Sequence, residues 1–184
     1  MPVNPQQVPA GVRAAFLAGL EDALWDDAVL LAKLRHGVNK IEGVPLFTAG
    51  LNAIGSAFQN PKPDGWRLFL STGGETVAAD VDTNGAQPRM RGLSRGGKLG
   101  AVYAAFKAIR SDPRLASGSY EMRLVRIAGV LLEACWFKAD GVGVDWVYPV
   151  VSGTKTIPPA ELRLVSDVMS VLPGLATRFR AFDG

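Results

Sequence analysis

The chain has 184 residues, of which 48% are apolar and 20% charged, a composition typical of one folded domain and not of a disordered chain. A net charge of +3 is too small to indicate a nucleic-acid-binding surface. One cysteine and one histidine exclude an intrachain disulfide and a Cys/His zinc site within one chain. The first residues lack the pattern of a signal peptide, and no segment reaches the roughly 20 apolar residues of a membrane helix. We therefore expect a cytoplasmic protein without membrane contact.

The first third of the chain is predicted to be helical. Residues 1–9 are rich in proline and glutamine, so we expect an irregular lead-in there. Apolar residues at helical spacing predict a long helix over residues 10–36, which ends in a basic last turn before Gly37. A second helix is predicted over residues 46–58, because Phe47 and later apolar residues recur on one side.

The middle of the chain contains a hairpin signal, a polar segment and a third helix. Two β-prone runs, residues 66–70 and 76–81, flank a glycine pair and predict a hairpin. Residues 82–97 are polar and rich in glycine, without periodicity, and predict a loop long enough to suggest a function. Residues 98–110 predict a helix.

The last part predicts three strands and a helix. The strands cover residues 120–127, 130–138 and 144–151, separated by short turns, and the helix runs from residue 157 to 172. A short tail at 175–184 completes the chain. The fold class is therefore α+β, a single domain over 1–184 in the order αα-ββ-α-βββ-α, with an antiparallel sheet of about five strands covered by about four helices.

Two motifs in the middle segment suggest ligands. Oxygen-bearing side chains alternate at Asp80, Asp82 and Asn84 before Gly85, as at the start of a calcium loop. The twelfth position of such a loop would hold a glutamate, but Arg91 stands there, so a strand end with an Asx turn is the competing interpretation.

The other motif is a basic, glycine-rich stretch before the third helix. The spacing from Gly92 to Lys98 matches a phosphate-binding loop, but Leu99 occupies the position of the magnesium-ligating hydroxyl. A simpler anion site remains open, as does a solvated loop without a ligand. Its candidate residues are Arg89, Arg91, Arg95 and Lys98.

Signals for catalysis are weak. His36 is the only histidine, so a histidine-dependent catalyst would have to use it. Its place in the last turn of a predicted helix already has a structural reason, because positive charge is favourable at a helix C-terminus. Cys135 lies in an apolar strand, as buried cysteines commonly do. Glu133 and Asp145 lie on neighbouring predicted strands and could form an acid/base pair, or Glu133 could pair with an arginine across the sheet.

Three aromatic residues on predicted strands, Trp66, Trp146 and Tyr148, are candidates for a partner surface, although aromatic side chains also pack ordinary sheets. We expect a non-enzymatic domain, partner-binding or regulatory, that contacts another protein or a second copy of itself and uses no cofactor. The alternatives are a binder of calcium or of a small anion through residues 82–98, and an enzyme of unrecognised type.

Overall fold

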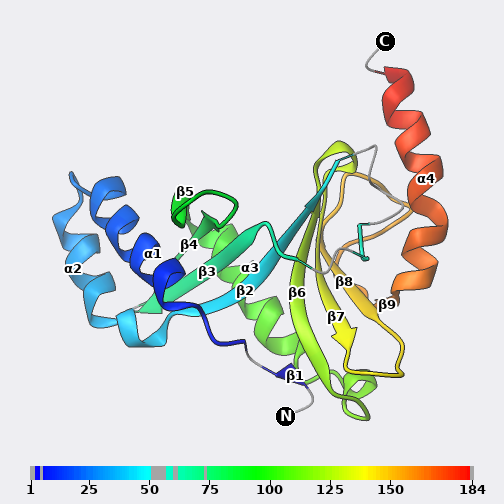
Figure 1. Ribbon diagram of the computed structural model, residues 1–184, viewed down its shortest axis with the longest axis horizontal. Helices are drawn as coiled ribbons and strands as arrows, with labels where there is room; N and C mark the ends of the chain where they lie inside the picture. Colours follow the sequence, from blue (N-terminus) through cyan, green and yellow to red (C-terminus); the bar gives the residue numbers. More distant parts are fainter. Residues whose placement is uncertain (1–2, 5, 51–56, 60–61, 73, 183–184) are drawn as a thin grey trace. The chain divides into compact units, whose positions relative to one another are not determined.

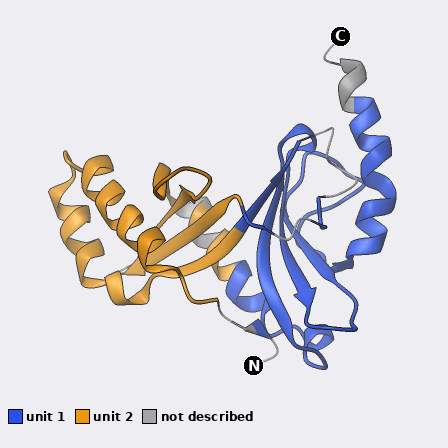
Figure 2. Cartoon of the chain, viewed as in Figure 1, with its two compact units in different colours: residues 1–5, 46–63, 105–184 blue, residues 6–45, 64–104 orange. Residues whose placement is uncertain are grey.

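The computed structural model describes residues 3–4, 6–50, 57–59, 62–72 and 74–182, and the chain divides into two compact units (Figures 1 and 2). The architecture is α+β, as predicted. In the described part of the chain, no helix combines the length and the hydropathy needed to cross a bilayer. Each unit has an apolar core of its own, and the expectation of one domain over 1–184 stays a prediction.

Unit 2 contains residues 6–45 and 64–104. Its strands follow the order β5-β4-β3-β2, and the antiparallel pairing of β3 with β4 confirms the predicted hairpin. Its elements are α1 (Ala10–Ala23), α2 (Ala28–His36), the 3-10 helix η1 (Val38–Lys40), the first half of β2 (Glu42–Ala49), β3 (Gly65–Thr72), β4 (Glu75–Asp82), β5 (Arg89–Arg95) and the start of α3 (Gly97–Ile109).

The helix predicted over residues 10–36 is in fact two helices. The first ends at Ala23 and the second begins at Ala28. Asp27 caps α2, because its carboxylate accepts a hydrogen bond from the backbone N–H of Leu30 at 3.1 Å. The apolar positions of α1 face the sheet and form the core of unit 2 with β3 and β4. The buried members of this core are Val12, Phe16, Leu20, Leu24, Leu34, Trp66, Leu68, Leu70, Val77, Ala79 and Val81.

Unit 1 contains residues 1–5, 46–63 and 105–184. Its strand order is β2-β6-β7-β8-β9, and β1 also pairs with β6. Its remaining elements are β1 (Val3–Asn4), the 3-10 helices η3 (Pro113–Leu115) and η4 (Ala128–Val130), β6 (Tyr120–Ile127), β7 (Leu132–Ala139), β8 (Trp146–Val151), β9 (Arg163–Leu164) and α4 (Val165–Phe182). The antiparallel pairs β6–β7 and β7–β8 confirm the predicted three-stranded meander.

The prediction of a five-stranded antiparallel sheet was wrong in two respects. Strands β1 and β2 run parallel to β6, so the pairing is mixed. The strands also outnumber five, because the lead-in contributes β1 and residues 89–95 of the predicted loop form β5. The pattern of β5 escaped detection because charged residues and glycine occupy most of it.

Two predicted helices differ from the structure. Residues 42–49 form strand β2, where the prediction placed the start of a helix over 46–58, and residues 51–56 lie outside the described residues. The last helix begins at Val165, later than residue 157, and continues through Pro173 to Phe182, so most of the predicted tail 175–184 is helical. Its Val168, Leu172, Leu175 and Ala176 pack against the sheet of unit 1.

Candidate functional site

An open groove of about 450 Å³ lies in unit 2 between α1 and β5. The helix contributes mostly small side chains, whereas the strand and the turn before it contribute two arginines and the flexible Met90. The lining residues are Ala15, Ala18, Gly19, Asp22, Ala23, Pro88, Arg89, Met90, Arg91, Gly92 and Leu93.

The floor of the groove depends on a close approach of α1 to β5. A Cβ atom on Gly19 would lie 2.7 Å from both Cβ and Sδ of Met90, so only glycine allows this packing. The pairing of β4 with β5 shifts by one residue, because Asp80 lies opposite Gly92 and Val81 opposite Met90. This bulge leaves Arg91 without a cross-strand partner and places Met90 on the core side together with Leu93.

The structure brings three of the four predicted anion-binding residues onto one strand, since Arg89, Arg91 and Arg95 all belong to β5. Arg91 pairs with Asp82, its Nε lying 3.1 Å from Oδ2, and Arg95 Nη1 lies 3.1 Å from Asp27 Oδ2. Both arginine side chains remain exposed, at 67% and 60%. Lys98 lies in the first turn of α3, and its side chain is outside the described part of the structure.

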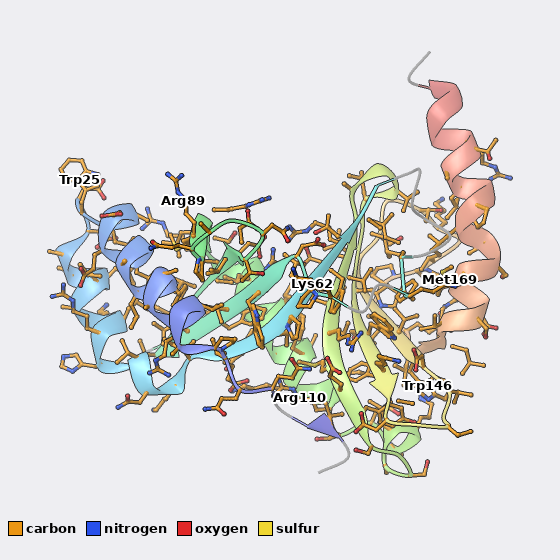
Figure 3. All side chains as sticks on the ribbon, in the orientation of Figure 1. Trp25, Lys62, Arg89, Arg110, Trp146 and Met169 are labelled. Atoms are coloured by element: carbon orange, nitrogen blue, oxygen red, sulfur yellow. The ribbon has the colours of Figure 1, made fainter. Side chains whose placement is uncertain are left out.

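Arg89 is the arginine of β5 that is not engaged. Its side chain is exposed and makes no ion pair or hydrogen bond with the described residues. It lines the groove and extends away from the ribbon, as Figure 3 shows. The strand thus presents one guanidinium without a partner among the described residues and two that are paired with partly exposed carboxylates.

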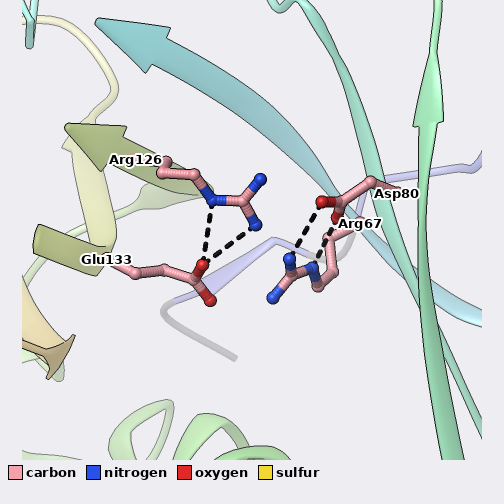
Figure 4. A network of polar contacts seen from close by, with 4 residues as sticks. All are labelled: Arg67, Asp80, Arg126 and Glu133. Atoms are coloured by element: carbon pink, nitrogen blue, oxygen red, sulfur yellow. Dashed lines mark hydrogen bonds and ion pairs between the residues drawn. The ribbon is translucent and has the colours of Figure 1, made fainter. Parts of the chain in front are cut away.

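Two of the three predicted calcium ligands, Asp80 and Asp82, are engaged by other groups. Asp80 accepts two hydrogen bonds from Arg67, Nε to Oδ1 at 2.6 Å and Nη2 to Oδ2 at 3.0 Å (Figure 4). Asp82 accepts from the Asn84 backbone N–H at 2.9 Å and from Arg91, and these bonds lower the pKa of its carboxyl. This is the Asx turn of the competing interpretation. Among the described residues, no group of three or more His, Cys, Asp or Glu side chains is placed to hold a metal ion.

The aromatic candidates for a partner surface differ in exposure. Trp66 is 7% exposed and belongs to the core of unit 2. Trp146 and Tyr148 lie on β8 in unit 1, and both are half-buried. The exposed tryptophan is Trp25 (81%), in the connection from α1 to α2, which sequence reasoning missed because it lies within an apparently continuous helix.

Glu133 and Asp145 have structural partners on opposite faces of β7, and Cys135 shares the face of Glu133. Glu133 Oε2 accepts from Arg126 Nε at 3.1 Å and Nη2 at 3.0 Å (Figure 4), the cross-strand pair that the sequence allowed. Asp145 accepts from the indole N–H of Trp136 at 2.9 Å, and Trp136 is on the face of β7 opposite Glu133 and Cys135. Burial raises the pKa of the Cys135 thiol, with the Glu133 charge as a second cause, which disfavours the nucleophilic thiolate.

His36 is exposed in the last turn of α2, where the predicted helix end placed it. Comparison with known proteins adds no relative: no protein-family model, no curated protein and no solved structure matches the chain.

Proposed function

We propose that this chain is a partner-binding domain that contacts another protein through the α1–β5 surface, the groove residues together with strand β5 in unit 2. The observation that carries the proposal is a groove of about 450 Å³ beside a terminal strand of the sheet. Terminal strands expose backbone N–H and C=O groups that a second chain can pair with, and proteins usually protect such edges unless they use them.

Exposed apolar residues at one end of this surface support a partner of protein class. Trp25, in the connection from α1 to α2, is 81% exposed, and Val29, in the first turn of α2, is 70% exposed. Asp27, two residues from each, is bonded to Arg95 of β5, so this connection adjoins the end of the strand. Tryptophan and arginine are the residues most enriched at the energetic centres of protein interfaces.

A selection with random peptides tests the proposal on the intact chain. A phage-displayed peptide library is panned against the wild-type protein, and the enriched peptides are then measured against two variants. Ala18→Trp fills the groove, because Ala18 is exposed on its lining. Ala14→Trp places the same side chain on an exposed position of α1 that is not part of the lining, and serves as the matched control.

We expect the enriched peptides to bind the wild-type protein and the Ala14→Trp variant equally, and to lose binding to Ala18→Trp. Circular dichroism of the three proteins checks that each is folded. Failure to enrich any peptide, or equal binding to all three proteins, contradicts the proposal.

A further inference from the structure

We infer that the occupant of the α1–β5 surface is an extended, acidic segment of another protein, which adds to the sheet as a strand beside β5. This inference rests on the proposed function and adds to it the chemical class of the partner. Three features of β5 carry the argument: its free edge, its charge and its poor fit to a second copy of itself.

The free edge makes an extended ligand the natural one. Strand β5 has seven residues and pairs with β4 alone among the described strands. In a sheet, alternate residues of a terminal strand direct their backbone N–H and C=O groups outward, where an added strand forms hydrogen bonds with them. The space beside Gly92 is open, since a Cβ there would meet nothing within 4 Å.

The charge of this edge selects an acidic ligand. The segment from residue 82 to residue 98 holds four basic residues and one acidic residue, and the side chains of Arg89, Arg91 and Arg95 are exposed. Arg89 has no partner among the described residues to displace. The pairs of Arg91 and Arg95 are exposed, and such pairs contribute little, so carboxylates of an incoming strand can replace Asp82 and Asp27.

A second copy of this chain is a poor occupant of the same edge. Antiparallel pairing of two β5 strands over their full length is centred on Gly92 and puts Arg89 of one copy opposite Arg95 of the other. Like charges directly opposite each other destabilise a strand pair. A strand with glutamate or aspartate at alternate positions replaces this repulsion by attraction.

Fluorescence anisotropy with defined peptides tests the inference. The first probe is a fluorescein-labelled ten-residue peptide in which glutamate alternates with valine, and the second replaces each glutamate by glutamine. Two further probes keep the glutamates but carry N-methyl groups on every second amide. One has them on the odd-numbered residues and the other on the even-numbered residues, so that each peptide loses the backbone donors along one of its two edges. We expect the acidic peptide to bind about tenfold more tightly than the glutamine peptide, because exposed charge pairs have small individual effects. Both N-methylated peptides should also bind more weakly, the one blocked on its pairing edge most of all.

Variants of the protein locate the effect. Arg89→Gln combined with Arg91→Gln and Arg95→Gln should reduce binding of the acidic peptide to the level of the glutamine peptide. Arg35→Gln is the matched control, since Arg35 is an exposed arginine of the same unit paired with Glu21, and it should leave binding unchanged. Raising the salt concentration from 0.1 M to 1 M should weaken binding of the acidic peptide selectively, as screening shortens from about 10 Å to about 3 Å.

The outcomes separate this inference from the proposed function. Equal binding of the acidic and glutamine peptides, both blocked by Ala18→Trp, overturns the acidic partner and leaves the partner-binding surface standing. Equal binding of the acidic peptide and both N-methylated peptides overturns strand addition. A ten-residue oligouridylate that binds more tightly than the acidic peptide, or inorganic phosphate that displaces this peptide and binds more tightly than it does, overturns the proposal that the partner is a protein.

Discussion

Replacement of Glu121 is expected to destabilise unit 1 more than replacement of Arg123, although the two side chains form one ion pair. Arg123 donates from Nε and Nη2 to the two oxygens of Glu121 at 2.8 and 2.9 Å. Its side chain is 9% exposed, whereas that of Glu121 is 28% exposed. The guanidinium lies 4.9 Å from the ring centroid of Phe47 and 4.8 Å from that of Trp136. Its Nη1 is buried and makes no hydrogen bond within the described structure.

The expected free energies of unfolding depend on which charged side chain of the pair remains after the substitution. Glu121→Gln leaves the guanidinium buried without a counter-charge, which for fully buried pairs costs about 3–5 kcal/mol, and the partial exposure of Glu121 reduces this to about 2–3 kcal/mol. Arg123→Met removes the buried charge together with Nη1 and leaves a carboxylate that reaches water. The loss of cation–π attraction, about 1–2 kcal/mol, is partly offset by sulfur–aromatic contacts, so we expect a cost of about 1 kcal/mol.

Urea unfolding monitored by far-ultraviolet circular dichroism measures both variants and their combination. The free energy of unfolding of the double variant should equal that of Arg123→Met alone, because Glu121 has no charge to neutralise once the arginine is gone. Glu161→Gln is the control: Glu161 pairs with Arg163 at the same spacing but is 54% exposed, so its loss should cost less than about 1 kcal/mol. If Arg123→Met proves as costly as Glu121→Gln, or more so, the reasoning about the stranded charge is refuted.

Three further predictions concern single groups. Asp27→Ala removes the N-cap of α2 and should lower the free energy of unfolding by about 1 kcal/mol, measured by urea titration, whereas an unchanged midpoint contradicts the cap. Cys135 is fully buried and its thiol pKa is raised, so Ellman's reagent should react with it only in urea, and rapid reaction with the native protein contradicts this burial. The Asn84 amide and Arg91 lower the pKa of Asp82, so its stabilising contribution is present above about pH 3.9 and is lost as pH falls through its folded-state pKa. The difference in urea midpoint between wild type and Asp82→Asn should therefore shrink from pH 6 to pH 2. A difference that stays constant contradicts a stabilising role of the charged Asp82 carboxylate.

The elements that were predicted correctly are those with local signals. The β3–β4 hairpin has β-prone runs on both sides of a glycine pair, and β6, β7 and β8 are separated by short turns. Helix α3 begins within one residue of the predicted position. In each case the pattern of neighbouring residues determines the structure, and distant contacts only reinforce it.

Strand β2 shows why other elements were missed. Its residues Val44 to Phe47 are all buried, and a continuous apolar run has no alternation to distinguish a strand from a buried helix. What decides in favour of a strand is pairing with β6, which lies more than 70 residues further along the chain. Helix α4 shows the opposite case, since its apolar face packs on the sheet of unit 1 and the helix continues through Pro173 in spite of the local penalty.

The candidate site was found from the sequence only in its charged half. The clustered arginines of residues 89–95 predicted an anion-binding segment, because charge is visible without a fold. The groove was invisible, since it depends on the small residues of α1 and on the contact of Gly19 with Met90, 71 positions away. The burial of Trp66, an expected partner-surface residue, was invisible for the same reason: only the fold places it in the core of unit 2.

The ion pairs of β5 bear on whether its arginines protect the edge or recognise a partner. Protection against self-association needs only charge, and the pairing of Arg91 with Asp82 and of Arg95 with Asp27 adds nothing to it. Recognition benefits from the same pairs, because they restrict two long side chains of β5 and so reduce the rotamer entropy lost when a ligand binds. Exposed pairs of this kind are weak enough to exchange for a ligand carboxylate. These pairs therefore support the recognition that we propose over simple protection of the edge.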